Sequence, residues 1–307
     1  YVRQLREADW EEVSFTGQYP LATIQFTDSS LPFSVIMEAY SPFIPLNADD
    51  SGLPATIFSI TVHNKDKSAL EASLVGWLQN ACLLFQKDKT SFKRQNSLIK
   101  KNNLLAVFCE SKQDITDSKI AQLPDYGTMC LSLLSDNGMA YTDFNTPELN
   151  AFNFKQKDDQ TVKDKQELLT GGLLQDLKVL PGKSQTANFI LSWHFPNSDL
   201  NVKDAQTGNY YSKKFKDAFE VAQYLGKNFQ RLEHDTKLWR DTWQDSTLPH
   251  WFLERTFSNT STLATTTCHR FGTGRFWSWE GVGCCEGTCT HVWQYAQAVA
   301  RTFPEIE

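Results

Sequence analysis

The stretch FSITVH, residues 58–63, decides the fold class of the first part of the chain. Its apolar residues Phe58, Ile60 and Val62 stand at every second position and alternate with polar ones. Such an alternation turns one face of a β-strand toward a core and the other toward solvent. The same pattern recurs at 22–27 (ATIQFT) and at 189–194 (FILSWH). We therefore expect half-buried strands over all three stretches.

Segments rich in turn residues separate the expected strands between Trp10 and about Phe195. They carry Pro, Gly, Asn and Asp, which favour the backbone angles of turns, and no amphipathic helix intervenes. Strands spaced in this way are typical of an antiparallel β-sandwich rather than of a parallel α/β sheet. In one such segment, SPFIPLNADDSG, we interpret Asp49 and Asp50 as turn formers, although the phrase could also line a domain junction.

Two stretches within this region, residues 86–103 and 153–170, are rich in lysine and glutamine. They show little periodicity of apolar residues, and charged runs without apolar anchors rarely become ordered. We predict that both are solvated loops that extend from the sandwich.

The spacing of apolar residues changes after about Tyr210. Across residues 213–243 they recur every three or four positions, which predicts a long amphipathic helix with Gly226 as its weak point. A second helix is expected from His250 to about Ala264, followed by an irregular segment over 271–288. A third helix should then end at Pro304.

A chain of 307 residues exceeds the usual size of one hydrophobic core, so more than one domain is expected. We predict a multi-domain β + α protein with a β-sandwich domain at 1–205, a linking helix at 206–247 and the start of a helical domain at 248–307. Three helices with wide apolar faces have too few partners, so we expect the helical domain to continue beyond Glu307.

The composition excludes several classes of partner. The formal net charge is −6, with 30 basic and 36 acidic residues and no long charged run, which argues against nucleic acid and anionic membranes as partners. No apolar stretch approaches the ~20 residues of a transmembrane helix. Aromatic residues make up 13% of the chain, and aromatic faces are surfaces on which sugar rings stack.

Cysteines gather in FWSWEGVGCCEGTCTHVWQYAQ, residues 276–297. Cys284, Cys285, Cys289 and His291 have the chemistry of zinc ligands, but structural zinc sites usually take two separated pairs, which these residues do not form. We therefore expect no metal, while a disulfide between two of these cysteines stays possible. The isolated Cys82, Cys109 and Cys130 are expected to be small buried apolar residues.

The same segment sets Glu280 directly after Trp279 and before Gly281. Tryptophans can stack on a sugar while a glycine lets the backbone approach, so Glu280 is a candidate glycosidase nucleophile. Glycoside cleavage needs a second carboxyl group across the bond. Taken alone the motif is weak, because a single glutamate is more often a surface charge.

Longer phrases resemble glycoside hydrolase family 116, which includes β-glucosidases, glucosylceramidases and β-xylosidases. The phrases are FTGQYPLATIQF, PFSVIMEAYSPFIPLNADDSGLPATIFSITVHN, LSWHFPN and RFWSWEGVGCCEGTCTHVWQYAQAVARTFPEIE. The resemblance runs from about Trp10 to Glu307. It implies an N-terminal β-sandwich joined to a C-terminal (α/α)6 barrel, a retaining mechanism on β-linked sugars, and no redox cofactor.

The resemblance also implies roles for single residues. The catalytic nucleophile of the family falls on Glu280. Our candidates for substrate binding are Trp277 and Trp279, as aromatic stacking faces, together with Thr290 and His291. His291, in the phrase THVW, stands where the glucosylceramidase branch has an aspartate that holds the sugar. The acid that protonates the leaving oxygen is expected beyond Glu307, so we expect residues 1–307 alone to be inactive.

The main alternative is a carbohydrate-binding protein without catalysis, in which Glu280 only bonds a hydroxyl group of a bound glycan. His194 ends an expected strand, and we interpret it as a satisfied histidine of the core or its rim rather than a catalytic one.

Overall fold

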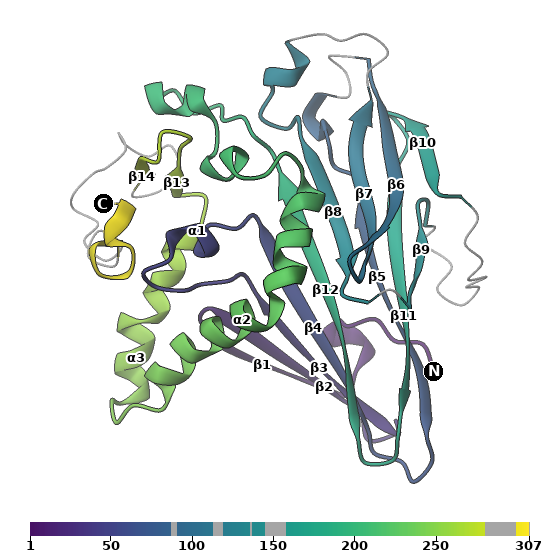
Figure 1. Cartoon of the computed structure of the whole chain (residues 1–307). Coiled ribbons are helices and arrows are strands. Elements are labelled where there is room, and N and C mark those ends of the chain that lie inside the picture. The colour runs from purple at the N-terminus through teal and green to yellow at the C-terminus, as the bar shows by residue number, and fades with distance from the viewer. Residues whose placement is uncertain (87–90, 113–118, 136, 145–157, 280–298, 307) are drawn as a thin grey trace.

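A nine-stranded antiparallel sheet forms the larger layer of the computed structural model (Figure 1). The structure describes residues 1–86, 91–112, 119–135, 137–144, 158–279 and 299–306. In spatial order the sheet contains β1 (Glu12–Gln18), β2 (Leu21–Thr27), β3 (Phe33–Tyr40), β4 (Ala55–Asn64), β12 (Ser184–His194), β8 (Thr128–Leu133), β7 (Leu104–Lys112), β6 (Lys93–Lys101) and β10 (Gln160–Asp164).

A second sheet of three strands packs against one face of the first. It consists of β5 (Leu70–Gln79), β11 (Thr170–Val179) and β9 (Met139–Tyr141), again antiparallel. The apolar core between the layers contains Leu131 and Phe189 from the large sheet and Leu173 from the small one. The predicted antiparallel β-sandwich is therefore confirmed, and the three expected strands lie within β2, β4 and β12.

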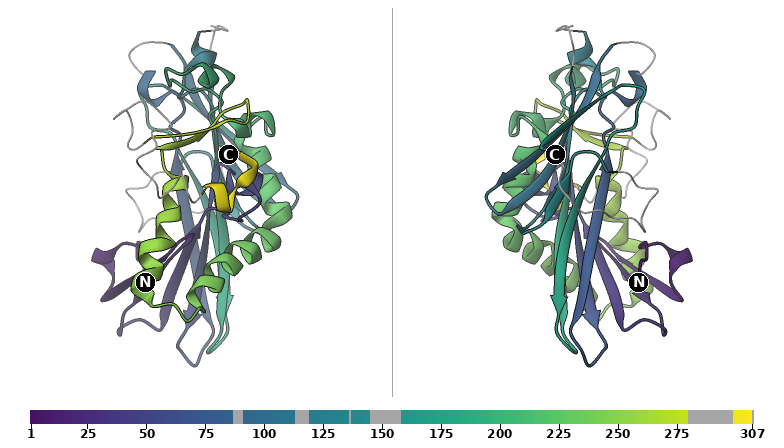
Figure 2. Two further views of the ribbon diagram at one scale, coloured as in Figure 1. Left: turned by 90° about the vertical axis from the view of Figure 1, so that its left-hand side faces the viewer. Right: turned by 90° about the vertical axis from the view of Figure 1, so that its right-hand side faces the viewer.

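Helix α2 (Ala218–Gln244) covers the other face of the large sheet (Figure 2). Val221 and Leu225 pack against Ile57 of β4 and Ile190 of β12, all of them fully buried. Where α2 covers them, β4 and β12 are therefore buried on both faces. Elsewhere the half-buried prediction is confirmed, since Gln25 of β2 is exposed and Thr61 of β4 is only partly buried. The polar side chain of Ser192 lies under the helix, where its hydroxyl donates to the carbonyl of Ala218 at 2.7 Å.

Two residues of the sequence explain where α2 begins and how closely it packs on the large sheet. Asp217 caps the helix by accepting a hydrogen bond from the backbone N–H of Glu220 at 2.8 Å. Gly226, predicted to be a weak point, lies inside a continuous helix. A Cβ at this position would lie 3.2 Å from the side chain of Leu104, so the glycine allows close packing of α2 on β7.

The predicted second helix is shorter than expected. Helix α3 (His250–Thr256) ends eight residues before Ala264, and residues Ser258–Ala264 form a 3-10 helix. The hydroxyl groups of Thr256 and Thr260 donate to the carbonyls of Phe252 and Phe257, at 2.6 and 2.5 Å. Ser, Thr and Asn side chains compete in this way for backbone groups and weaken an α-helix.

The prediction of two solvated loops is wrong for most of the described residues concerned. Residues 93–101 form β6, and residues 160–164 form β10, which pairs with it in register. Arg94, Gln95 and Asn96 are buried although they are polar. Their hydrogen bonds make this possible, as when the Asn96 amide donates to the carbonyl of Thr142 at 2.9 Å.

Three short elements complete the fold near α2. They are α1 (Ala48–Ser51), which interrupts the loop between β3 and β4, and the two-stranded pair β13 (Cys268–Arg270) and β14 (Phe276–Ser278). Strand β13 lies just before the segment expected to be irregular, residues 271–288, and β14 lies within it. Residues 299–302 are helical and Pro304–Ile306 form a 3-10 turn, so only the end of the predicted third helix falls among the described residues. Among the described residues, no helix has both the length and the apolar content of a bilayer span.

Candidate functional site

The predicted substrate-binding tryptophans lie at the end of the β13–β14 hairpin. Trp277 is opposite His269 in the register of the two strands, and the backbone N–H of Trp279 donates to the carbonyl of Thr267 at 2.9 Å. The turn depends on Gly274, whose φ of 92° is accessible to few other residues. The hairpin therefore fixes the backbone up to Trp279, the residue before Glu280.

An aromatic cluster surrounds both indoles. The ring centroids of Trp277 and Trp279 are 6.3 Å apart, and His269 meets Trp279 edge-on at 5.6 Å. The guanidinium of Arg275 lies 4.8 Å from the centre of the Trp277 ring, a cation–π contact that occupies part of this indole. Trp279 is buried, and Trp277 is partly exposed. Trp277 is thus the more accessible of the two predicted stacking residues.

The tip of the hairpin is attached to the segment that follows β12. Gly272 donates its N–H to the carbonyl of Gly208 at 2.7 Å, and Phe271 forms a backbone bridge with Asn209. Arg275 at the tip pairs with Asp204 at 2.9 Å. Phe271 is fully buried, so the hairpin has an apolar anchor in addition to these polar contacts.

Asp49 connects α1 to the last residue of β13, beside the turn of the hairpin. Its carboxylate accepts a hydrogen bond from Arg270 at 2.8 Å and pairs with Lys214 on its other oxygen. The Arg270 guanidinium lies 3.5 Å from the centre of the Tyr210 ring. Partial burial acts to raise the pKa of Asp49, but the hydrogen bonds from Lys214 and Arg270 outweigh it and hold the pKa below its usual value.

Asp50 connects the same turn to α2. Its buried carboxylate accepts hydrogen bonds from the Tyr224 hydroxyl at 2.7 Å and from Arg231 at 2.8 Å. Burial and the neighbouring Asp50 raise the pKa of Tyr224, and the hydrogen bond to Asp50 raises that of Arg231. Within the turn, the N–H of Asp50 donates to the side chain of Asn47 at 3.0 Å. Asp49 and Asp50 thus lie in a turn as predicted, but it is Asn47 that caps this turn. The two carboxylates bind side chains from distant parts of the chain rather than their own backbone.

Several predicted residues lie outside the described part of the chain. They are Glu280, Thr290 and His291, together with the cysteine cluster Cys284, Cys285 and Cys289. Of the described cysteines, Cys82, Cys109, Cys130 and Cys268 are all free thiols. The described residues contain no group of three or more His, Cys, Asp or Glu side chains arranged to hold a metal ion.

His194 and Cys82 are both buried, as predicted. His194 is 6% exposed, and its Nε2 lies 2.8 Å from the carbonyl of Phe215, which assigns the ring proton to that nitrogen. Burial lowers the pKa of His194. Cys82 is fully buried, and burial raises the pKa of its thiol to about 12, as expected for an apolar role.

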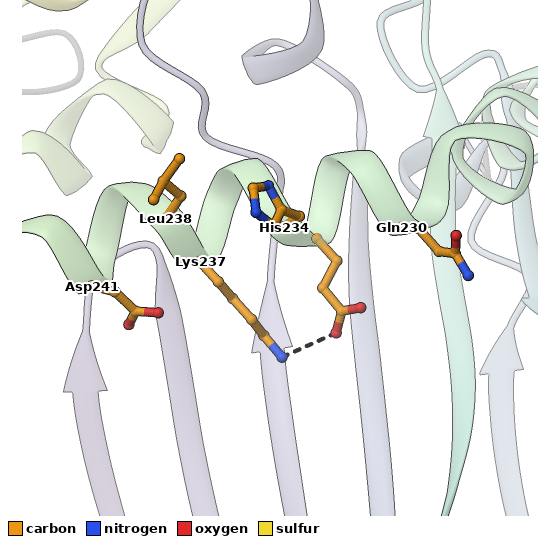
Figure 3. Close-up of a pocket in the computed structure, with 6 residues that line it drawn as sticks. Gln230, His234, Lys237, Leu238 and Asp241 are labelled. Carbon is orange, nitrogen blue, oxygen red and sulfur yellow. Dashed lines mark hydrogen bonds and ion pairs between the residues drawn. The ribbon is translucent and has the colours of Figure 1, made fainter.

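A hollow of about 380 Å³ lies on α2 (Figure 3). Its lining comes from one helix alone: Gln230, Glu233, His234, Lys237, Leu238 and Asp241. Lys237 bridges Glu233 and Glu38 of β3, at 3.0 and 2.9 Å, and so its charge is already neutralised. None of the lining residues belongs to the hairpin, so this hollow and the predicted substrate-binding residues are separate features.

Comparisons with solved structures give only distant likenesses. A protein described as a kojibiose phosphorylase from the human microbiome shares 12% identity at a TM-score of 0.36, over 73% of this chain and 23% of that one. A family GH92 α-mannosidase from Bacteroides thetaiotaomicron shares 8% at a TM-score of 0.24, over 85% of this chain and 28% of that one. The chain thus spans less than a third of either structure. A search of curated proteins found no match.

A comparison with protein families is decisive. Residues 2–232 match the family described as "beta-glucosidase 2, glycosyl-hydrolase family 116 N-term". The match includes the sandwich, α1 and the first half of α2. Because it covers most of the 307 residues, this chain belongs to glycosyl-hydrolase family 116 and carries its N-terminal domain.

Proposed function

We propose that this chain is part of a retaining β-glycosidase, of the β-glucosidase or glucosylceramidase kind, with a carbohydrate or glycoside as its substrate. The family match over residues 2–232 carries the proposal. The hairpin adds support, since its two tryptophans stand immediately before Glu280. Its Trp277 keeps partial exposure, as a residue that stacks on a sugar requires.

In the proposed reaction the carboxylate of Glu280 attacks the anomeric carbon. A carbon–oxygen bond to the enzyme forms as the bond to the leaving group breaks, and an acid gives its proton to the departing oxygen. Water then hydrolyses the covalent glycosyl-enzyme and restores the carboxylate. Trp277, Trp279, Thr290 and His291 are the proposed substrate contacts, and the chemistry needs no cofactor.

The domain division is part of the same proposal. It assigns residues 1–205 to the sandwich, 206–247 to a linking helix and 248–307 to the start of an (α/α)6 catalytic domain. The acid is assigned to a residue outside 1–307, as the resemblance to the family implies. In a retaining enzyme this acid and the nucleophile face each other at about 5 Å across the bond.

A covalent labelling experiment tests the proposal. The complete protein, incubated with a 2-deoxy-2-fluoro-β-glucoside or a cyclophellitol-type reagent, should gain one adduct at Glu280 by peptide mass spectrometry. Glu280→Gln should abolish the adduct. Reversible sugar binding without any adduct in the complete protein would instead favour the carbohydrate-binding alternative. Rapid turnover of an aryl β-glucoside by residues 1–307 alone would contradict the assignment of the acid.

A further inference from the structure

The loop between β3 and β4, residues 41–54, contacts the chain on both sides of the segment 280–298. Upstream, its Asp49 binds Arg270 at 2.8 Å. Downstream, the N–H of Leu46 donates to the carbonyl of Thr302 at 2.6 Å, and the N–H of Ala48 donates to the Glu305 carboxylate at 2.8 Å. In Figure 1, α1 of this loop lies beside β13 and the C-terminal residues. We call residues 41–54 the bridging loop.

We propose that the bridging loop holds the Trp277/Trp279 hairpin and residues 302–306 in fixed positions relative to each other, with Asp49 and Glu305 as its positioning residues. The structural part rests on the described contacts alone. Its consequence for catalysis rests on the proposed function, because Glu280 lies in the sequence between the two attached ends.

The bridging loop is suited to this task because it is itself rigidly held. The hydroxyl of Ser51 accepts from the N–H of Ile44 and donates to its carbonyl, at 2.8 and 3.0 Å. Asp50 ties the loop to α2 through Tyr224 and Arg231. A loop that is closed on itself and attached to a helix packed on the large sheet moves little, so the position of Asp49 is well defined.

The upstream contact is an ion pair in which one carboxylate binds two cations. The carboxylate of Asp49 lies between two cations, Lys214 and Arg270, and each of its oxygens binds one of them. The planar Arg270 guanidinium also covers the ring of Tyr210, which fixes its orientation. Replacing the carboxylate by an amide would leave the two cations beside each other without an anion.

The downstream contact combines a charge with an aromatic anchor. The Glu305 carboxylate caps the first turn of α1 at Ala48, where the helix would otherwise have an unsatisfied N–H. Phe303 packs edge-on against Phe43 of the bridging loop at 5.4 Å and is 4% exposed. The loop therefore attaches the chain at both flanks through different kinds of contact.

Hydrogen exchange measured by mass spectrometry on residues 1–307 tests the structural part. Asp49→Asn should exchange about fivefold faster in peptides covering 268–279, because a partly exposed charge-assisted contact is lost. Glu305→Ala should do the same in peptides covering 299–306. Peptides from β4 and β12 should be unchanged in both variants. Asp28→Asn is the matched control, since the hydrogen bonds of that carboxylate are made to Ser30 in its own turn. Equal exchange of 268–279 in Asp49→Asn and the control would overturn the proposal.

Labelling kinetics in the complete protein test the catalytic consequence. With a cyclophellitol-type reagent, Asp49→Asn should lower the limiting rate of Glu280 labelling by about fivefold or more, and Asp49→Glu should partly restore it. A purely structural role predicts equal limiting rates at a temperature where both proteins are folded, and that result would overturn the catalytic consequence. Absence of labelling in the unsubstituted complete protein would refute the proposed function, and the exchange experiment would still decide whether the loop positions the hairpin.

Discussion

Replacement of Asp50 by asparagine should destabilise the protein, because this carboxylate joins the sandwich to α2. The Asp50 side chain is 5% exposed, and it binds Arg231 at 2.8 Å and Tyr224 at 2.7 Å. A hydrogen bond to a charged group contributes ~1.5–3 kcal/mol, and leaving a buried partner unsatisfied adds to the loss. The Arg231 side chain is 43% exposed and can rehydrate, which reduces the effect. We expect Asp50→Asn to lower the free energy of unfolding by about 2 kcal/mol.

Chemical denaturation followed by tryptophan fluorescence measures this loss. Asp235→Asn is the matched control on the same arginine. Asp235 is partly exposed and lies 3.8 Å from Arg231, so its replacement should change the unfolding free energy by less than about 0.5 kcal/mol. A double-mutant cycle with Arg231→Met isolates the pair, with an expected coupling of about 1–2 kcal/mol. A coupling near zero, or equal effects of the two asparagine variants, would refute the reasoning.

Three further predictions concern burial. His194 is held neutral because its pKa in the folded protein lies below the unfolded value near 6.5, so unfolding takes up a proton. Its contribution to stability should be complete above about pH 6.5 and fall as the pH drops below that value, and His194→Gln should flatten the dependence in denaturation midpoints measured from pH 5 to 8. Gly226→Leu should lower stability by about 1–3 kcal/mol in the same assay because it crowds Leu104, and an unchanged midpoint would contradict the close approach of α2. The Cys82 thiol, with a pKa of about 12, should resist iodoacetamide at pH 8 until the protein unfolds, which mass spectrometry of the alkylated peptides would show.

The expected strands could be predicted because their pattern is local. Phe58, Ile60 and Val62 face the second sheet, and period two reports that face directly. The long helix was predictable for the same reason, since Val221, Leu225 and Leu232 form a stripe on one side.

Strand β6 could not be predicted because its stability comes from distant partners. Asn96 is fully buried, yet nothing near it in the sequence shows that Asn80 and Thr142 will meet it. Polar residues of this kind are read as solvent-exposed from the sequence, and only paired strands supply the hydrogen bonds that allow burial. The end of α3 was missed for a smaller reason, the competition of Thr256 and Thr260 for backbone carbonyls.

The candidate site shows the same division. The sequence by itself determined the alternating strands, the amphipathic helix and the family phrases, including the WEG motif, because each is a pattern of neighbours along the chain. Only the tertiary structure decided that Asp49 meets Arg270, 221 residues later, and that Ala48 meets Glu305. Contacts across such separations depend on how sheet, helix and hairpin pack together, and a single sequence carries no local record of that packing.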